Sequence, residues 1–570
     1  MNGWPAKLYD DLAQTGLLSV PELDAIARVI RQPDEPVMSA LSKAGIASEE
    51  KLLQALAQAL QLPFTRLSEQ EIDSAVRPKV PTKAVFQHNI MPVRMEDGSL
   101  LVATNDPFNL AMIESLRMVT QLRVRPALSP MADIQKALKR YYGVGAETLD
   151  ELIQKNVLDL DMTAVVTKED VASDDQEASV VKFVNQIIAE AYKERATDIH
   201  LEPMENDLRI RYRVDGVLHQ VPVPAQLKRF QAAIISRIKV MAGVDIAERR
   251  LPQDGRINVR SSGAEIDVRV STIPTAYGES VSLRLLMRSS IFLGLDKLGL
   301  CPGDEKIVRK LVELPHGIVL VTGPTGSGKS TSLYAFLSTI NSIDQRIITI
   351  EEPIEYELPG VNQMQVRPDI GLTFGSGLRH ILRQDPDVIM VGEIRDLETA
   401  EIAIRAALTG HLVFSTLHTN DAAGAVTRLL DMGIEPFLVS SSVEAIIAQR
   451  LVRTLCPSCK TPYTPDAELL KEIGFPATDG PVTFYRGCGC EECLFTGYRG
   501  RTGIYEILVV HEILRPLIIE RAPASTIKQH ACAGGMRTLR DDGWAKVLAG
   551  VTTVEEVTRV TQEDEALAGT

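Results

Sequence analysis

Four short apolar runs mark the C-terminal half of the chain, at residues 318–321, 347–350, 388–391 and 412–415, with helical stretches between them. Continuous apolar runs of this length are typical of strands that are buried on both faces. Such strands belong to parallel sheets with crossover helices. The pattern therefore predicts an α/β fold after Gly317.

The middle of the chain has a different period. A helix is expected from Ser179, and residues 208–218 then alternate apolar and basic side chains around Asp215-Gly216, a dipeptide typical of hairpin turns. Residues 266–271 and 281–286 repeat the alternation, so we expect a sheet with a basic face. Taken alone, such a face is most simply a solvated one. Its basic side chains are Arg209, Arg211, Arg213, Arg269 and Arg284.

The first 60 residues contain a weak internal repeat. Residues 12–23 and 41–52 both place Leu-x-x-x-Gly before a serine, which indicates a helix that ends at a glycine and a second helix that the serine caps. Two helical hairpins are expected. Residues 80–142 predict a small α+β module, and residues 143–178 lose periodicity and gather acids, which favours a flexible linker.

Composition and charge narrow the class of protein. The 570 residues are 45% hydrophobic and 24% charged, as in globular domains. The net charge of −14 argues against sequence-independent binding to nucleic acid or acidic lipid. The start lacks an apolar core followed by a cleavage site, and no apolar run approaches about 18 residues. We expect neither a signal peptide nor a membrane span.

The most specific motif follows the first apolar run. Residues 323–330 fit G-x-x-x-x-G-K-[ST], the phosphate-binding loop of nucleotide hydrolases, between an expected strand and an expected helix at 330–340. Glycines let successive N–H groups point at one anion, and the lysine and serine of the motif reach phosphate and Mg²⁺. The motif predicts that ATP phosphates bind Gly323, Pro324, Thr325, Gly326, Ser327, Gly328, Lys329, Ser330 and Thr331, with Ser330 on Mg²⁺.

The other three apolar runs also end in polar residues. They are followed by Glu351-Glu352-Pro353-Ile354-Glu355, by Gly392-Glu393 and by Thr416-Leu417-His418, and His411 precedes the last run. Ligands of open α/β sheets bind at the carboxyl ends of the strands, so carboxylates, an imidazole and the phosphate loop should meet at one edge. Phosphoanhydride hydrolysis needs this combination of groups. Gly392 is unusual, because the strand that carries the metal-binding acid normally ends in aspartate at this position.

With that glycine, residues 382–396 resemble the type II/type IV secretion ATPase superfamily. Residues 351–355 are similar to the aspartate box of that family, except for Glu352 where aspartate is usual, and residues 409–418 are similar to its histidine box. The resemblance covers about 179–561. It implies a RecA-like ATPase core after a PAS-like α+β domain, with Glu355 orienting the attacking water, Glu393 as the Walker B glutamate, and Arg269 and Arg284 closing over a nucleotide in an assembled ring.

The resemblance also implies a cytoplasmic homo-hexamer that works at the inner membrane through platform and cytoplasmic-domain partner proteins. The segment at 424–437 most resembles the type II secretion branch of the family, and a type IV pilus extension ATPase is the alternative. Pilus-retraction motors lack the zinc module and the N-terminal domains, which argues against retraction. The Arg-Leu-Gly opening of modules that bind cyclic di-GMP is absent from the repeat, so a docking role is favoured there.

Five of the seven cysteines cluster near the end of the core. Cys456-x-x-Cys459 and Cys490-x-x-Cys493 have the spacing of a closed, structural zinc site in a reducing compartment, with Cys488 as a spare thiol that could compete. Cys301 and Cys532 are interpreted as ordinary buried residues.

Together, these patterns predict five parts. They are a helical docking domain at 1–78, an α+β module at 79–142, the linker at 143–178, the arginine-bearing domain at 179–292, and an ATPase domain at 293–570 that includes a zinc module at 450–500. Two other classes stay open at this stage. A nucleic-acid translocase is disfavoured by the acidic charge and the lack of an aromatic-basic groove, and a regulatory protein would bind nucleotide without turnover.

Overall fold

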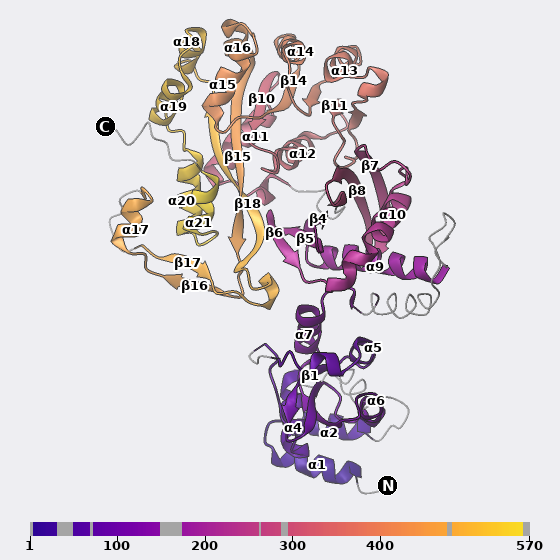
Figure 1. Cartoon of the computed structure of the whole chain (residues 1–570). Coiled ribbons are helices and arrows are strands. Elements are labelled where there is room, and N and C mark those ends of the chain that lie inside the picture. The colour runs from indigo at the N-terminus through magenta and orange to yellow at the C-terminus, as the bar shows by residue number, and fades with distance from the viewer. Residues whose placement is uncertain are drawn as a thin grey trace. The chain divides into compact units, whose positions relative to one another are not determined.

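A computed structural model of the chain describes residues 4–30, 49–68, 72–146, 148, 174–261, 264–286, 294–475 and 482–561. The chain divides into two compact units, Met1–Leu285 and Leu286–Thr570 (Figure 1). None of the described helices is long and apolar enough to cross a membrane.

The first unit begins with helices and a three-stranded sheet of order β1-β2-β3. The strands are β1 (Met91–Glu96), β2 (Ser99–Thr104) and β3 (Arg123–Leu128). The helices are α1 (Trp4–Gln14), α2 (Val20–Ile30), α4 (Glu49–Leu60), η1 (Arg77–Lys79), α5 (Thr82–Gln87), α6 (Leu110–Thr120) and α7 (Met131–Tyr142). The predicted strands of the α+β module are confirmed.

The first copy of the repeat folds as its residues predict. After α1 the chain turns at Gly16, whose φ of 66° suits glycine. Ser19 precedes α2, and its N–H and hydroxyl both donate to the Glu22 carboxylate at 2.7 Å, as in one half of a capping box. The second copy lies largely outside the described residues, apart from the start of α4.

Most of the predicted linker also lies outside the described residues. Helix α9 (Asp174–Lys193) begins five residues before the predicted start at Ser179. The sequence that leads into Ser179 is acidic, and a helix start favours negative charge. The predicted helix start was therefore wrong, because acids that favour a helix start were interpreted as linker.

The rest of the first unit is a six-stranded sheet of order β6-β5-β4-β9-β8-β7. The strands are β4 (Ala196–Pro203), β5 (Leu208–Val214), β6 (Val217–Val221), β7 (Gln253–Ser261), β8 (Ala264–Thr275) and β9 (Gly278–Leu286), and the helices are α9, η2 (Ala225–Phe230) and α10 (Gln231–Ala242). Asp215 and Gly216 have φ of 48° and 87°, as a two-residue hairpin between β5 and β6 requires. Phe183 of α9 and Ile234 of α10 pack in one core with Tyr212 of the sheet, so the alternation separates an apolar face from a basic one.

The second unit is built on a seven-stranded sheet of order β12-β11-β13-β14-β10-β15-β18. The first six strands run parallel, and β18 pairs antiparallel with β15. Their bounds are β10 (Gly317–Thr322), β11 (Ile347–Glu351), β12 (Asn362–Gln365), β13 (Val388–Val391), β14 (Leu412–Leu417), β15 (Val443–Leu455) and β18 (Tyr498–Val509). The four apolar runs are β10, β11, β13 and β14, and the predicted parallel sheet is confirmed.

Helices cover both faces of this sheet (Figure 1). Ile318 and Leu320 of β10 point into the core that contains α14 and α15, whereas Val319 and Val321 point into the core that contains α12. All six residues of β10 are therefore buried, which explains the continuous apolar run. The elements around the sheet are η4 (Leu295–Lys297), α11 (Pro302–Val312), α12 (Lys329–Ile340), η5 (Pro368–Ile370), α13 (Phe374–Ile381), α14 (Leu397–Leu408), α15 (Ala422–Asp431), α16 (Pro436–Ser442), α18 (Leu514–Ile519), α19 (Ala524–Ala533), α20 (Leu539–Leu548) and α21 (Val554–Val560).

A small module is inserted between β15 and β18. Its elements are β16 (Lys460–Tyr463), α17 (Ala467–Glu472), β17 (Phe484–Gly487) and η6 (Glu491–Cys493).

Candidate active site

The phosphate loop joins the end of β10 to the start of α12. Gly326 and Gly328 have φ of 80° and 89°, in the left-handed region that lets N–H groups turn toward one point. Ser330 and Thr331 are exposed in the first turn of α12, where the helix N-terminus favours an anion. The hydroxyl of Ser327 is buried and has no hydrogen-bond partner within the described ranges. The loop has the geometry that its sequence predicts.

Lys329 is buried at the base of this loop. Its ammonium donates to the carbonyl oxygens of Gly323 at 2.7 Å and Pro324 at 3.1 Å, which uses two of its three hydrogens. Burial lowers the pKa of Lys329 to about 8; the carboxylate of Glu393 opposes the shift, and Arg450 adds to it. The loop therefore holds a cation that a phosphate group would stabilise.

The strand next to β10 brings the predicted imidazole to the same edge. The Thr322 hydroxyl, at the end of β10, lies 2.7 Å from the Thr419 hydroxyl and 3.1 Å from the Leu417 carbonyl oxygen. His418, between these two residues, places Nε2 3.2 Å from an oxygen of Glu393. Glu393 and His418 are thus brought together beside the phosphate loop, as predicted.

Arg395 is a further member of this edge that the sequence reasoning did not single out. Its guanidinium forms ion pairs with Glu393 and, at 3.1 Å, with Glu352. Arg395 is exposed, whereas the side chain of Glu393 is only 13% accessible, so the arginine covers the carboxylate from the solvent side. The sequence signal that could have identified Arg395 is its position two residues after Glu393, a predicted catalytic glutamate.

Gly392 has a steric reason for lacking a side chain. A Cβ at this position would lie 3.3 Å from both the Glu351 Cα and the Ile350 carbonyl oxygen, on the backbone of the neighbouring strand. The Gly392 N–H also donates to that carbonyl oxygen at 2.8 Å. The usual aspartate would be crowded here, and the first carboxylate beyond the strand is therefore Glu393.

The segment after β11 contains two different kinds of glutamate. Glu351 is buried and accepts hydrogen bonds from the hydroxyls of Thr349 and Tyr334. Burial raises its pKa, against the effect of these hydrogen bonds. Glu355 lies in the following loop with its side chain partly accessible. Accessibility thus separates a structural carboxylate from one that can meet a substrate.

His411 is not brought to this edge. It precedes β14, whereas His418 follows it, and six extended residues between them span about 20 Å. The Nδ1 atom of His411 lies 2.9 Å from the carbonyl oxygen of Ala406, at the end of α14. Within the subunit, His411 therefore lies away from the phosphate loop, and the prediction that it meets the other catalytic groups at this edge is wrong.

The two predicted arginines belong to the first unit. Arg284, on β9, is exposed, and its Nε donates to Asp198 at 3.0 Å. Arg269 is half-buried on β8, opposite Arg256 in the register of β7. Both lie on the sheet with the basic face.

The four predicted metal ligands form one cluster. Their sulfur atoms all lie within 4.8 Å of one another, with Cys456–Cys490 at 3.6 Å and Cys459–Cys493 at 3.8 Å. Tetrahedral zinc with Zn–S bonds of about 2.3 Å needs S···S separations of about 3.8 Å. The N–H groups of Cys490 and Gly497 donate to the Cys493 sulfur at 3.1 and 3.3 Å, as they would to a thiolate. The four thiols fit zinc.

The remaining cysteines lie outside that cluster. Cys488 is exposed, with its sulfur 3.2 Å from the Thr461 hydroxyl, and does not compete for the site. Cys301, predicted to be an ordinary buried residue, is half-buried, and its thiol donates to Asp542 at 3.1 Å. Cys532 is also half-buried.

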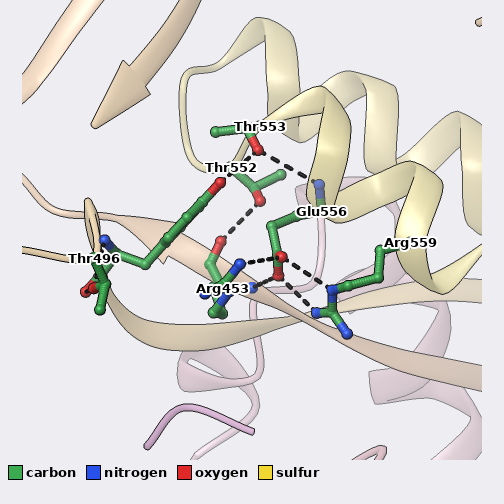
Figure 2. A network of polar contacts seen from close by, with 7 residues as sticks. Arg453, Thr496, Thr552, Thr553, Glu556 and Arg559 are labelled. Carbon is green, nitrogen blue, oxygen red and sulfur yellow. Dashed lines mark hydrogen bonds and ion pairs between the residues drawn. The ribbon is translucent and has the colours of Figure 1, made fainter. Parts of the chain in front are cut away.

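A buried glutamate joins β15, close to where the metal module begins, to the C-terminal helix α21. Figure 2 shows Glu556 of α21 between Arg453 of β15 and Arg559, with hydrogen bonds of 2.7 Å to each guanidinium. Burial opposes ionisation of Glu556, but hydrogen bonds from the two arginines outweigh it and lower its pKa to about 2. The Arg453 guanidinium also lies 4.0 Å above the ring of Tyr498, which follows the cysteine pair. These contacts hold α21 against the ends of β15 and β18 between which the module is inserted.

Taken together, a phosphate loop with its lysine and an acid–imidazole pair at one edge of a parallel sheet define a P-loop nucleotide hydrolase. The chain belongs to the type II/IV secretion system protein family, whose model matches residues 173–559, and an MshEN domain matches residues 60–148. The predicted family and α/β fold are confirmed.

Two curated relatives span most of the chain. The type IV pilus assembly ATPase PilB of Myxococcus xanthus is 43% identical over 563 residues, which cover 98% of this chain and 99% of the relative. The type II secretion system protein E of Pseudomonas aeruginosa is 54% identical over 410 residues, 71% of this chain and 81% of the relative. Among solved structures, the Legionella pneumophila ATPase DotB has a TM-score of 0.50 and 22% identity, over 66% of this chain and 95% of its own, which supports the fold alone. The protein is an ATPase of secretion and pilus-assembly machines.

Proposed function

We propose that this ATPase drives pseudopilus assembly and protein export in type II secretion. The 54% identity to a type II secretion protein E supports this assignment, and so does the resemblance of residues 424–437 to the type II secretion branch. The second candidate is extension of a type IV pilus, which the match to PilB along nearly its whole length favours.

For the chemistry, we propose that Lys329 binds the β- and γ-phosphates and that Ser330 ligates Mg²⁺, which neutralises phosphate charge. Glu355 orients the attacking water, and Glu393 and His418 act at the γ-phosphate. The observation that carries this proposal is Glu393, which is held between His418 and Arg395 at the same sheet edge as Lys329. Arg395 bridges Glu352 and Glu393, and so fixes the direction of the Glu393 carboxylate at this edge.

We further propose that the chain works as a homo-hexamer in which Arg269 and Arg284 close over a nucleotide. The N-terminal domains would dock on inner-membrane platform and cytoplasmic-domain proteins, which places the motor in the cytoplasm at the inner membrane. The exposed guanidinium of Arg284 supports this role, because its partner Asp198 leaves most of the side chain accessible. We propose zinc at the four cysteines, in a structural role.

The chemistry is tested with Glu393→Gln and Glu355→Gln. Both variants should bind ADP within about threefold of wild type and lose at least about 100-fold in kcat, because the carboxylate acts in the transition state. Glu401→Gln is the matched control, since Glu401 is an exposed glutamate of α14 paired with Arg405. Retention of kcat by either site variant would remove that residue from the mechanism, and negligible turnover by wild type would favour a regulatory protein.

The choice of machine is tested in the native host. A strain that lacks the gene is complemented with wild type or Glu393→Gln, and both exported proteins and surface pili are measured. Type II secretion predicts that only wild type restores export while pili are unchanged. Restoration of pili without any change in export would assign the protein to pilus extension instead.

A further inference from the structure

A tyrosine on the phosphate helix contacts the loop that contains Glu355. Tyr334 is one of the buried residues of α12, the helix that begins at Lys329. Its hydroxyl donates to a carboxylate oxygen of Glu351 and accepts the backbone N–H of Glu355 at 3.2 Å. One phenolic oxygen therefore joins the phosphate helix, the end of β11 and the residue proposed to orient water.

Gln363 of β12 completes the attachment of this loop. Its side-chain amide donates to the other oxygen of Glu351 at 3.0 Å and to the Tyr356 carbonyl oxygen at 2.9 Å. Its carbonyl oxygen accepts the Leu358 N–H at 2.7 Å. Tyr334 and Gln363 thus hold three backbone groups of residues 355–358, and both side chains converge on Glu351.

Glu351 itself is poorly placed to meet a substrate. It is 4% exposed, and Thr349 at 2.6 Å, Gln363 and Tyr334 all donate to its two oxygens. A buried carboxylate saturated in this way orients its partners more effectively than it could bind a mobile ligand. The T-shaped contact of Tyr334 with Tyr356, at 6.2 Å between ring centroids, further restricts the phenol.

We propose that Tyr334, anchored by Glu351, is a positioning residue for ATP hydrolysis that sets the backbone of Glu355 relative to the phosphate helix. This inference rests on the proposed role of Glu355. Because α12 holds Lys329 and Ser330 in its first turn, a fixed link from that helix to residue 355 relates the carboxylate to the bound phosphates. A displacement of about 1 Å at such a group can reduce turnover about 100-fold.

The test is Tyr334→Phe, which removes the hydroxyl and retains the ring. Residue 355 then loses a backbone hydrogen bond, so we expect kcat to fall at least about tenfold while KM for ATP changes less than about twofold. Tyr212→Phe is the matched control, because Tyr212 is also a buried phenol whose hydroxyl donates to a backbone carbonyl oxygen, that of Ile187, at 3.0 Å, and it lies in the first unit, outside the phosphate helix. The control should lower the melting temperature by a similar amount and leave kcat within about twofold.

A double-mutant cycle separates positioning from general destabilisation. Residual hydrolysis is measured with radiolabelled ATP in Glu355→Gln with and without Tyr334→Phe. If Tyr334 acts through Glu355, the second substitution should change kcat less than about twofold in that background. An equal loss of kcat in both backgrounds would overturn the inference, as would an unchanged kcat in Tyr334→Phe alone. Wild-type kcat in Glu355→Gln would instead refute the proposed role of Glu355, whatever Tyr334→Phe does.

Discussion

Lys329 makes nucleotide binding sensitive to pH in the range in which an ATPase is assayed. Burial lowers its pKa to about 8 in the free protein, against the opposing carboxylate of Glu393. A bound phosphate chain stabilises the charged ammonium and must raise this pKa. By linkage, nucleotide binding takes up a proton wherever the free lysine is neutral, and affinity falls as pH rises.

The magnitude follows from the titration of one group. With a pKa of about 8, roughly 90% of the ammonium is charged at pH 7 and roughly 10% at pH 9. The dissociation constant for ADP should therefore increase about tenfold between these pH values, which corresponds to about 1.4 kcal/mol. Proton uptake per ADP bound should rise from about 0.1 at pH 7 to about 0.9 at pH 9.

Calorimetric titration with ADP, in buffers of different ionisation enthalpy, measures both quantities. ADP suits the measurement because a terminal phosphate with a second pKa of about 6 is already about 90% ionised at pH 7, so its own titration contributes little between pH 7 and 9. Circular dichroism at each pH controls for unfolding. A dissociation constant that stays within about twofold from pH 7 to 9, or binding without proton uptake, would refute a depressed pKa at Lys329.

Three further outcomes are expected. Gly392→Ala should lower the free energy of unfolding by about 1–3 kcal/mol in urea denaturation, because its Cβ meets the backbone of β11. Gly303→Ala has open space in helix α11 and should be neutral or stabilise by up to about 1 kcal/mol; equal effects of the two substitutions would refute the steric argument. Glu556→Gln should lower the free energy of unfolding by about 3 kcal/mol at pH 7, because the pKa of Glu556 is about 2 in the folded protein and 4.5 in the unfolded chain. This stability is lost as pH falls from about 5 to 2, so the effect of the substitution should shrink over that interval. Glu492→Gln, at an exposed glutamate, should lower the free energy of unfolding by less than about 1 kcal/mol. Purified protein should contain one zinc per chain by mass spectrometry of metals. The Cys456→Ser variant should lose this zinc and melt at a lower temperature. A zinc content that does not change with this substitution would refute zinc binding at the four cysteines.

The parallel core was predictable because its strands are buried on both faces. Each of the four apolar runs became a strand within one or two residues, and their common direction placed the residues that follow them at one edge. The zinc ligands were predictable for a similar reason, since two Cys-x-x-Cys turns have few other uses. In both cases a local pattern has essentially one three-dimensional consequence.

Other features depend on contacts between distant segments, which a local pattern does not encode. His411 and His418 flank one strand, and only the parallel pairing of β14 with β10 shows that His418, and not His411, lies at the edge of the phosphate loop. Glu351 and Glu355 look equivalent in sequence, but burial and Tyr334 separate their roles. The early start of α9 shows the reverse error, in which acids were assigned to a linker although helix N-termini also favour them.

Gly392 shows how packing of the sheet determines where the acids of this site lie. The close approach of its backbone to β11 crowds any side chain at the end of β13. The acid therefore moves one residue on, to Glu393, which lies beyond the last ladder pair between β13 and β14, where Arg395 and His418 can both reach it. A carboxylate held by two such groups is fixed in direction, and each of its oxygens keeps a further lone pair for a metal or a water. Arg395→Gln removes one of the two groups that fix this direction and should therefore lower kcat in a steady-state ATPase assay, even though this side chain lies on the solvent side of Glu393; an unchanged kcat would refute the argument.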